Sequence, residues 1–325
     1  MTTTGLGSVP GDDIREWMRA VLELVDIPFL PELPARPYGD MLSRSVAVLT
    51  ELAADLQPVG WRLTGGGDAR ASLDQRRARA LLKEDLDVLE EYCDGYEGPL
   101  KVQVAGPWTL AATVERPRGD KVLADHGARR DLAQALAAGV EEHLAEVRKR
   151  VPGAEVLLQV DEPALPAVLA GAVPTASGWS KHRSVDGPGA VELLSLLTSA
   201  APTVVHCCAA RPPIEVFTKA GAGGVAVDVS LLNNAAWDQI AVAVEAGTTV
   251  YAGLVATTGA VPDKEQAARP LIQRWRELGL DPELMKQVVI TPACGLAAAP
   301  SPRDARTRLN LLRAVADVIG DAAEA

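Results

Sequence analysis

Thr203-Val204-Val205-His206-Cys207-Cys208 is the stretch that decides the fold, because a short β-branched run ends there in polar side chains. The next such run, Gly224–Val227, ends in the same way at Asp228. Runs of this kind favour β-strands, and they recur on both sides of this stretch between amphipathic or Ala/Leu-rich helical segments. Strands that alternate with helices indicate parallel pairing with right-handed crossovers.

The alternation predicts eight strand–helix units, the number that closes an α/β barrel. An open doubly wound sheet is the alternative, but no Gly-x-Gly-x-x-Gly follows an early strand. We therefore expect one (β/α)8 TIM barrel over residues 1–325, with a flexible turn at Gly65-Gly66-Gly67 and an extended crossing segment at Pro28–Pro37. The strands are expected at Thr2–Leu6, Gly60–Leu63, Lys101–Val104, Glu155–Val160, Thr203–Val205, Gly224–Val227, Thr248–Leu254 and Gln287–Ile290, and helices at Asp13–Val25, Ser72–Tyr92, Arg129–Arg150, Ala190–Ser199, Ala235–Ala246, Lys264–Leu278 and Arg303–Ile319.

Composition excludes several classes of function. The 325 residues include 32 Lys+Arg and 43 Asp+Glu, and the net charge of −11 argues against a general nucleic-acid binder. No window approaches the ~18 apolar residues of a membrane span, and the N-terminus lacks the regions of a signal peptide. The four cysteines are too few for a disulfide scaffold and fit a reducing cytosol, so we expect a cytoplasmic protein.

Polar residues cluster where the expected strands end. Ser8, Asp161, His206, Asp228 and Cys294 each follow a different strand. Barrel enzymes place their chemistry at this end of the strands, so the pattern predicts an enzyme.

His206-Cys207-Cys208 predicts a metal site, because alternate side chains of a strand share a face. His206 and Cys208 then offer nitrogen and sulfur to one tetrahedral zinc, while Cys207 points away. Cys294 and Asp228 are candidates for the third and fourth ligands. Two other interpretations stay open: a buried core histidine with small hydrophobic cysteines, and a redox pair between Cys207 and Cys208, which adjacent cysteines form only with strain.

Several segments, in order along nearly the whole chain, resemble the catalytic barrel of cobalamin-independent methionine synthase. Three of them carry the candidate ligands, and the other three resemble the family's Ile-Gly-Ser, Gly-Pro-x-Thr and Gln-x-Asp-Glu-Pro-Ala-Leu motifs. In chain order they are Gly5-Leu6-Gly7-Ser8-Val9-Pro10, Gly106-Pro107-Trp108-Thr109, Gln159-Val160-Asp161-Glu162-Pro163-Ala164-Leu165, Val204-Val205-His206-Cys207-Cys208, Gly224-Val225-Ala226-Val227-Asp228 and Thr291-Pro292-Ala293-Cys294-Gly295-Leu296.

The resemblance implies a barrel of the methionine synthase and uroporphyrinogen decarboxylase superfamily that methylates the thiol of homocysteine. It implies zinc held by His206, Cys208, Cys294 and Asp228, although the family has glutamate at the last position. Leu6 and Ser8 lie in the segment that contacts homocysteine, where Ser8 would bind the carboxylate. Asp161 would hold the ammonium group. A thiol on zinc is deprotonated, which makes it the nucleophile that accepts the methyl group.

The methyl-donor side departs from the family. Tyr251-Ala252-Gly253-Leu254 stands where the family has Tyr-Asp-Ile-His, the His-Gly-Glu-Pro segment has no evident counterpart near Leu63–Ser72, and the long N-terminal half is missing. The donor is therefore a methyl-folate or a methyl-corrinoid, and loss of the proton-relaying histidine favours methylcobalamin or a corrinoid donor protein over methyltetrahydrofolate. Trp108, Arg116 and Trp179 are the donor-site candidates.

Two other functions remain open from the sequence. One is a related zinc barrel that alkylates another thiol or acts like uroporphyrinogen decarboxylase. The other is a non-catalytic barrel that binds zinc or thiols.

Overall fold

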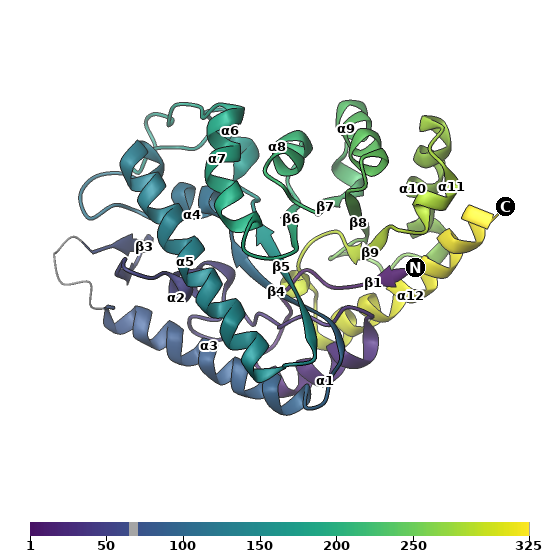
Figure 1. Ribbon diagram of the computed structural model, residues 1–325, viewed down its shortest axis with the longest axis horizontal. Coiled ribbons are helices and arrows are strands. Elements are labelled where there is room, and N and C mark those ends of the chain that lie inside the picture. Colours follow the sequence, from purple (N-terminus) through teal and green to yellow (C-terminus); the bar gives the residue numbers. More distant parts are fainter. Residues whose placement is uncertain (65–70, 325) are drawn as a thin grey trace.

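The computed structural model describes residues 1–64 and 71–324, and its centre is a curled sheet of seven parallel strands (Figure 1). The strand order is β1-β9-β8-β7-β6-β5-β4. The predicted parallel alternation is thus confirmed for seven of the eight expected strands. Their bounds are β1 (Thr2–Thr3), β4 (Gly98–Ala105), β5 (Ala154–Asp161), β6 (Thr203–Cys207), β7 (Gly224–Asp228), β8 (Thr249–Val255) and β9 (Val289–Pro292).

The second predicted strand forms with the predicted bounds, but its expected place in the parallel barrel sheet is wrong. Gly60–Leu63 forms β3, but it pairs antiparallel with β2 (Ala54–Gln57) in a separate two-stranded sheet. The predicted barrel is therefore not fully closed by strands within the described residues. The expected turn at Gly65–Gly67 lies outside the described residues.

The gap between β1 and β4 is spanned by residues 27–32, part of the proline-rich segment expected to cross inside the domain. Ile27 bridges Thr4, and Phe29 bridges Lys101, both in parallel. The amide of Lys101 donates to the Pro28 carbonyl at 2.8 Å. Prolines have no N–H to donate, so a run rich in them makes isolated bridges where a regular strand would make a ladder.

Helices cover the outer face of the sheet, and most begin at a side chain that caps their first turn. Asp13, Ser72, Asp125, Asp186 and Asp263 each accept hydrogen bonds from backbone N–H groups at a helix start, which satisfies donors that the helix leaves free. The helices are α1 (Ile14–Leu24), α2 (Met41–Val48), α3 (Leu73–Tyr92), α4 (Pro107–Thr113), α5 (His126–Arg150), α6 (Leu165–Leu169), α7 (Gly187–Thr198), α8 (Ile214–Lys219), α9 (Asn234–Glu245), α10 (Lys264–Leu278), α11 (Pro282–Met285) and α12 (Pro302–Glu324).

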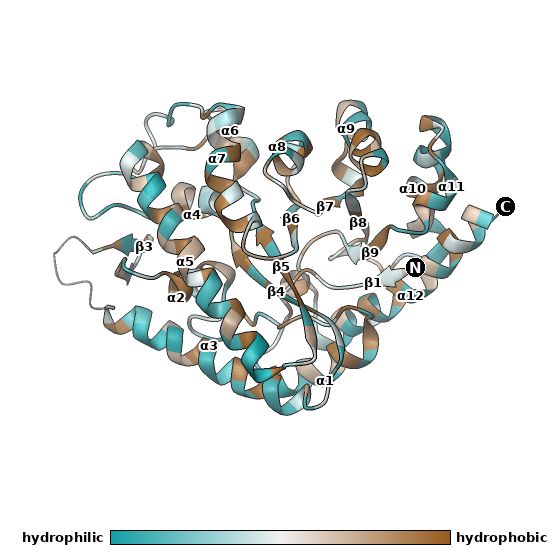
Figure 2. Cartoon of the chain, viewed as in Figure 1, coloured by the Kyte–Doolittle hydropathy of each residue, from teal (hydrophilic) through white to brown (hydrophobic). Residues whose placement is uncertain are grey.

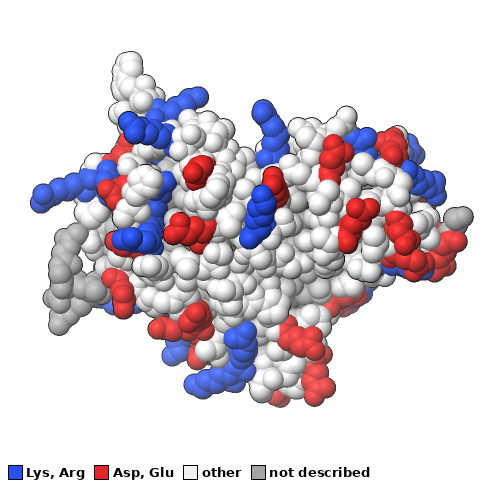
Figure 3. Space-filling view, turned by 45° about the horizontal axis from the view of Figure 1, so that its top comes forward, with Lys and Arg blue, Asp and Glu red and all other residues white. Residues whose placement is uncertain are grey.

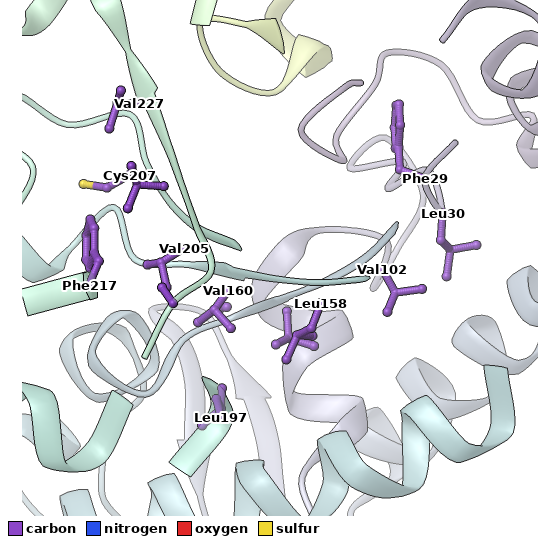
Figure 4. Packing of buried hydrophobic residues seen from close by; sticks show 14 of the residues in the cluster. Phe29, Leu30, Val102, Leu158, Val160, Leu197, Val205, Cys207, Phe217 and Val227 are labelled. Atoms are coloured by element: carbon purple, nitrogen blue, oxygen red, sulfur yellow. The ribbon is translucent and has the colours of Figure 1, made fainter. Parts of the chain in front are cut away.

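Burial divides the molecule into two apolar layers. In Figure 2 hydrophobic residues dominate β4 and β5, whereas α3 carries hydrophilic residues along much of its length. The larger cluster lies between the sheet and the helices, and Figure 4 shows part of it, with Val160 and Val205 of the sheet near Leu197 of α7. A small second cluster, Leu6, Val204, Ala226, Tyr251 and Val289, packs on the inner face of the sheet. No helix in the described part of the chain is long and apolar enough to cross a membrane.

Candidate metal centre and active site

The end of β6 brings His206 against Asp161. The two residues are register partners on the neighbouring strands β5 and β6, so their side chains share the inner face. His206 Nδ1 lies 2.7 Å from Asp161 Oδ1, and both side chains are almost completely buried. A carboxylate at Nδ1 fixes the ring and directs the other nitrogen, Nε2, toward whatever ligand the site holds.

His206, Cys208 and Cys294 form a cluster that fits a metal ion. Their ligand atoms all lie within 4.8 Å of one another, and the Sγ atoms of the two cysteines are 2.8 Å apart. His206 Nε2 is buried and has no hydrogen-bond partner among the described residues. A buried polar atom without a partner is costly, and a metal ion would satisfy it. One nitrogen and two sulfur donors suit zinc.

The charges of the cluster favour a thiolate. Contact with the Cys208 thiol, aided by His206, lowers the pKa of Cys294 well below its ordinary value, and the same contact raises the pKa of Cys208. Burial opposes a charged imidazole at His206, but the hydrogen bonds and charges of Asp161 and Cys294 outweigh it and raise the pKa of His206 to about 9. The thiolate is the form of cysteine that binds metal.

Cys207 points to the opposite face, as the alternation of the strand predicts. It is fully buried in the outer layer and lies near Phe217 of α8 in Figure 4. Burial raises the pKa of its thiol to about 12, so it stays protonated. The structure has Cys207 and Cys208 as free cysteines and places them on opposite faces of the strand.

Asp228, the predicted fourth ligand, is not brought into the cluster. It ends β7 on the same face as Ala226, the register partner of His206. Its Oδ1 accepts hydrogen bonds from the backbone N–H of Ser230 at 2.9 Å and from the Ser230 hydroxyl at 2.6 Å. Aspartate at this place caps the short helical turn that follows the strand, and the metal cluster contains only the other three residues.

A buried polar chain leads from Asp161 to β4. Gln159 Nε2 donates to Asp161 Oδ1 at 2.7 Å and to the Leu6 carbonyl at 3.1 Å, while its Oε1 accepts from the ammonium of Lys101. Burial lowers the pKa of Lys101 to about 7. Sequence reasoning missed Lys101, although a single charged residue within β4 was the available signal.

Glu32 is a second residue that sequence reasoning missed. It ends the segment that spans the gap, bridges Ser8, and is buried, with Oε1 lacking a hydrogen-bond partner among the described residues. Burial raises its pKa to about 8, and the negative charge of Asp161 adds to the effect. The His-Gly-Glu-Pro segment has no evident counterpart near Leu63–Ser72, and β3 lies outside the main sheet. The signal was the lone acid in Leu30-Pro31-Glu32-Leu33-Pro34.

The opening segment meets the metal cluster from the other side. The Leu6 side chain belongs to the inner apolar cluster, and the Ser8 carbonyl accepts from the Leu296 amide at 2.7 Å. A Cβ at Gly295 would lie 2.0 Å from Ser8 Oγ, so only glycine allows this approach. Ser8 is thereby held beside the residue that follows Cys294.

Sequence comparison decides the family. Residues 97–318 match the family described as the catalytic domain of cobalamin-independent synthase. The chain belongs to this family. Membership makes it a methyltransferase enzyme. Among curated proteins, the comparison found no match.

The solved structures agree with this family assignment at the level of the fold. A B12-independent methionine synthase from Shewanella sp. W3-18-1, in complex with selenomethionine, shares 16% sequence identity at a TM-score of 0.65, covering 98% of both chains. The carboxyl transferase domain of Rhizobium etli pyruvate carboxylase matches 69% of this chain and 41% of its own, with 18% identity and a TM-score of 0.26, too low to support an argument.

Two motifs of this synthase domain, Gly106-Pro107-Trp108-Thr109 and the one that contains Glu162, are joined by hydrogen bonds. Glu162 is fully buried and accepts hydrogen bonds from the backbone N–H groups of Trp108 at 2.9 Å and Thr109 at 2.8 Å. A Cβ at Gly106 would lie 2.2 Å from Glu162 Oε1, so the glycine is required. Glu162 therefore caps α4 and joins the turn after β4 to the end of β5.

The donor-site candidates of the synthase domain do not converge on the metal cluster. Trp108 is buried, and its indole N–H donates to the Ala190 carbonyl at 3.0 Å, so it has a packing role. Trp179 is almost fully exposed, on the loop that the Pro174–Lys181 bridge closes. Arg116 lies beyond α4 and pairs with Asp125 at 3.7 Å. Trp108, with only 2% of its surface exposed, offers little of its ring to a donor molecule.

Proposed function

We propose that this domain is a zinc-dependent methyltransferase that transfers a methyl group to the thiol of homocysteine and so forms methionine. The observation that carries the proposal is the cluster of His206, Cys208 and Cys294 beside the buried Asp161. The family assignment supports methyl transfer, and the related structure from Shewanella holds selenomethionine, an analogue of the product.

His206, Cys208 and Cys294 are the residues that would hold the zinc. When bound, zinc would lower the pKa of a thiol ligand and so provide a thiolate nucleophile at neutral pH. The protein's own contribution is orientation, because Asp161 fixes His206 and Gln159 fixes Asp161. Three protein ligands leave one position of a tetrahedral site for the substrate.

Acidic groups beside the cluster suit the amino-acid part of homocysteine. Asp161 Oδ2 makes no hydrogen bond to the described residues, and Glu32 Oε1 is also without a partner. An ammonium group that bound between these two carboxylates would neutralise their mutual repulsion, which contributes to the raised pKa of Glu32. We assign the carboxylate to Ser8, whose close approach to Gly295 holds it beside the cluster.

The family assignment favours a folate as the methyl donor, because the family is described as cobalamin-independent. The corrinoid protein expected from the sequence as a partner is unsupported on the same ground. Leu254 stands where a proton-relaying histidine was sought, so another acid must protonate a departing folate amine. We also propose that residues 1–325 form one catalytic domain, a barrel variant in which residues 27–32 replace one strand.

Turnover with defined donors tests the proposal. The purified chain, loaded with zinc, is incubated with homocysteine and either methyltetrahydrofolate or methylcobalamin, and methionine is measured by mass spectrometry. We expect methionine from the folate, loss of turnover on chelation, recovery on addition of zinc, and no turnover by Cys294→Ser. Absence of methionine with both donors from protein that binds zinc would indicate a non-catalytic barrel.

A further inference from the structure

A cavity of about 950 Å³ lies away from the metal cluster, between the start of α5, the loop after α4 and the loop that leads into α7. None of His206, Cys208 and Cys294 lines it. Its size is at the upper end of the range for sites of small molecules and cofactors. This region also differs from the rest of the chain in charge.

Cationic side chains gather around this cavity, although the whole chain has a net charge of −11. Figure 3 shows Lys and Arg at the upper left, over the loops that join α4 to α5 and α6 to α7. The lining contains five Lys and Arg residues from three separate segments and three acidic residues. The cationic residues are Arg116, Arg129, Arg130, Lys181 and Arg183.

Two of the acidic residues are already used within the fold. Asp120 accepts from the amides of Lys121 and Ala176, both at 2.8 Å, and contacts His182 Nε2 at 3.2 Å. Asp186 accepts from the Gly189 amide at 2.9 Å and caps α7. These two carboxylates hold the cavity walls together, while Glu192 also lines the cavity and Arg116 pairs with Asp125 at 3.7 Å. The other four cationic residues of the lining make no ion pair with the described residues.

Arg129 is the most informative residue of the cavity. Only 8% of its surface is exposed, and its guanidinium makes no hydrogen bond or ion pair with the described residues. Its guanidinium carbon lies 5.9 Å from the centre of the Trp108 ring. Arg116 Nε is fully buried without a hydrogen-bond partner among the described residues. A buried guanidinium N–H such as that of Arg116 is costly to leave unpaired, and an anion in the cavity would satisfy it and pair with Arg129.

We propose that this cavity binds a small molecule that carries at least two negative charges, as carboxylates or phosphates, on an apolar body. Several cations on three segments match more than one charge, and the planar guanidinium of Arg129 suits bidentate contact with either acid group. Leu123, Val185 and Leu193 line the remainder and suit the apolar part. This inference does not rest on the proposed methyl transfer.

Calorimetric titration of the whole chain tests the proposal with two probes, benzene-1,3,5-tricarboxylate and pyrophosphate, at fixed ionic strength. We expect at least one to bind in a 1:1 ratio and to weaken as salt rises. A stronger tricarboxylate signal identifies a carboxylate ligand, and a stronger pyrophosphate signal a phosphate ligand. Failure of both probes to bind would overturn the proposal.

Three variants locate the binding. Arg129→Gln should raise the dissociation constant about tenfold or more, because one charge-assisted contact is lost. Lys181→Gln/Arg183→Gln, on the exposed loop, provides the same test if Arg129→Gln does not fold. Arg269→Gln, an equal charge change on α10 outside the cavity, should bind like the unmodified chain. Equal loss in the α10 variant, or none in the cavity variants, would refute the site.

Discussion

Two parts of the inner sheet hold their functional groups in different ways. From β5 to β9, parallel strands bring Asp161 and His206 together by register, and Cys294 joins them from the turn just after β9. Between β1 and β4, residues 27–32 place Glu32 through isolated bridges in a proline-rich run. Strand pairing thus accounts for most of the candidate metal cluster, whereas the position of Glu32 depends on packing of a few side chains such as Phe29.

The two phenylalanines of the chain provide the strongest test of this contrast. Phe29 packs in the bridging segment with its ring 5.4 Å from Lys101 Nζ, and Phe217 lies in the outer layer on α8. Each Phe→Ala change should cost about 3–5 kcal/mol of unfolding free energy in denaturant titration. Only Phe29→Ala should also weaken homocysteine binding. An equal effect of both variants on that binding would show that the bridging segment has no special link to the site.

The metal cluster gives the next largest effect. Cys208→Ser or Cys294→Ser should lower zinc affinity by roughly 100-fold or more, since loss of a direct ligand exceeds the 10- to 100-fold cost of losing an outer partner. Cys207→Ala, one residue away on the opposite face, should keep about one zinc per chain in metal analysis of the purified protein. Loss of zinc from Cys207→Ala would contradict the face assignment.

The two aspartates at strand ends distinguish a site residue from a cap. Asp161→Asn should weaken homocysteine binding by about ten- to hundredfold, the effect of one charge-assisted hydrogen bond, and should also lower zinc affinity through His206. Asp228→Asn keeps an oxygen for Ser230 and should change neither. Competition with a zinc chelator and calorimetry with homocysteine measure both quantities. Loss of zinc from Asp228→Asn would show that Asp228 is a zinc ligand after all.

Glu32 gives the most gradual expected effect, a dependence of stability on pH that is small within any one pH unit. Its pKa is about 8 in the folded chain and 4.5 in the reference state, so between these values the folded state binds the extra proton. Stability from this group is therefore present at low pH and declines, as pH rises toward 8, by at most about 1.4 kcal/mol per pH unit. Glu32→Gln should remove that decline, which unfolding curves from pH 5 to 9 would show. If the stability of Glu32→Gln fell with pH as steeply as that of the unmodified chain, the Glu32 carboxylate would be exposed to water and would not cause the decline.

The regular part of the fold was predictable, and the irregular part was not. β-branched runs with polar ends identified seven strands and placed His206, Cys208 and Cys294 correctly for contact, because strand periodicity determines which side chains share a face. Gly60–Leu63 has the same local pattern, but it pairs with the adjacent Ala54–Gln57 in a hairpin, and its own sequence does not indicate which partner it takes. Glu32 and Lys101 escaped notice because only burial makes them unusual. Arg129 could not be singled out from the sequence, because only the folded structure shows that its guanidinium has no hydrogen-bond partner among the described residues.

The pairing of Thr2 with Val289 has a consequence for how the chain is made. β1 leaves the ribosome long before its sheet partner β9 is synthesised. Cys294 lies just after β9, so the last ligand atom of the cluster is made together with that strand. Closure between such distant segments is a slow folding step. The metal site can therefore be completed only after the whole segment from β1 to Cys294 has emerged, and a chain truncated before β9 would expose the edges of both β1 and β8.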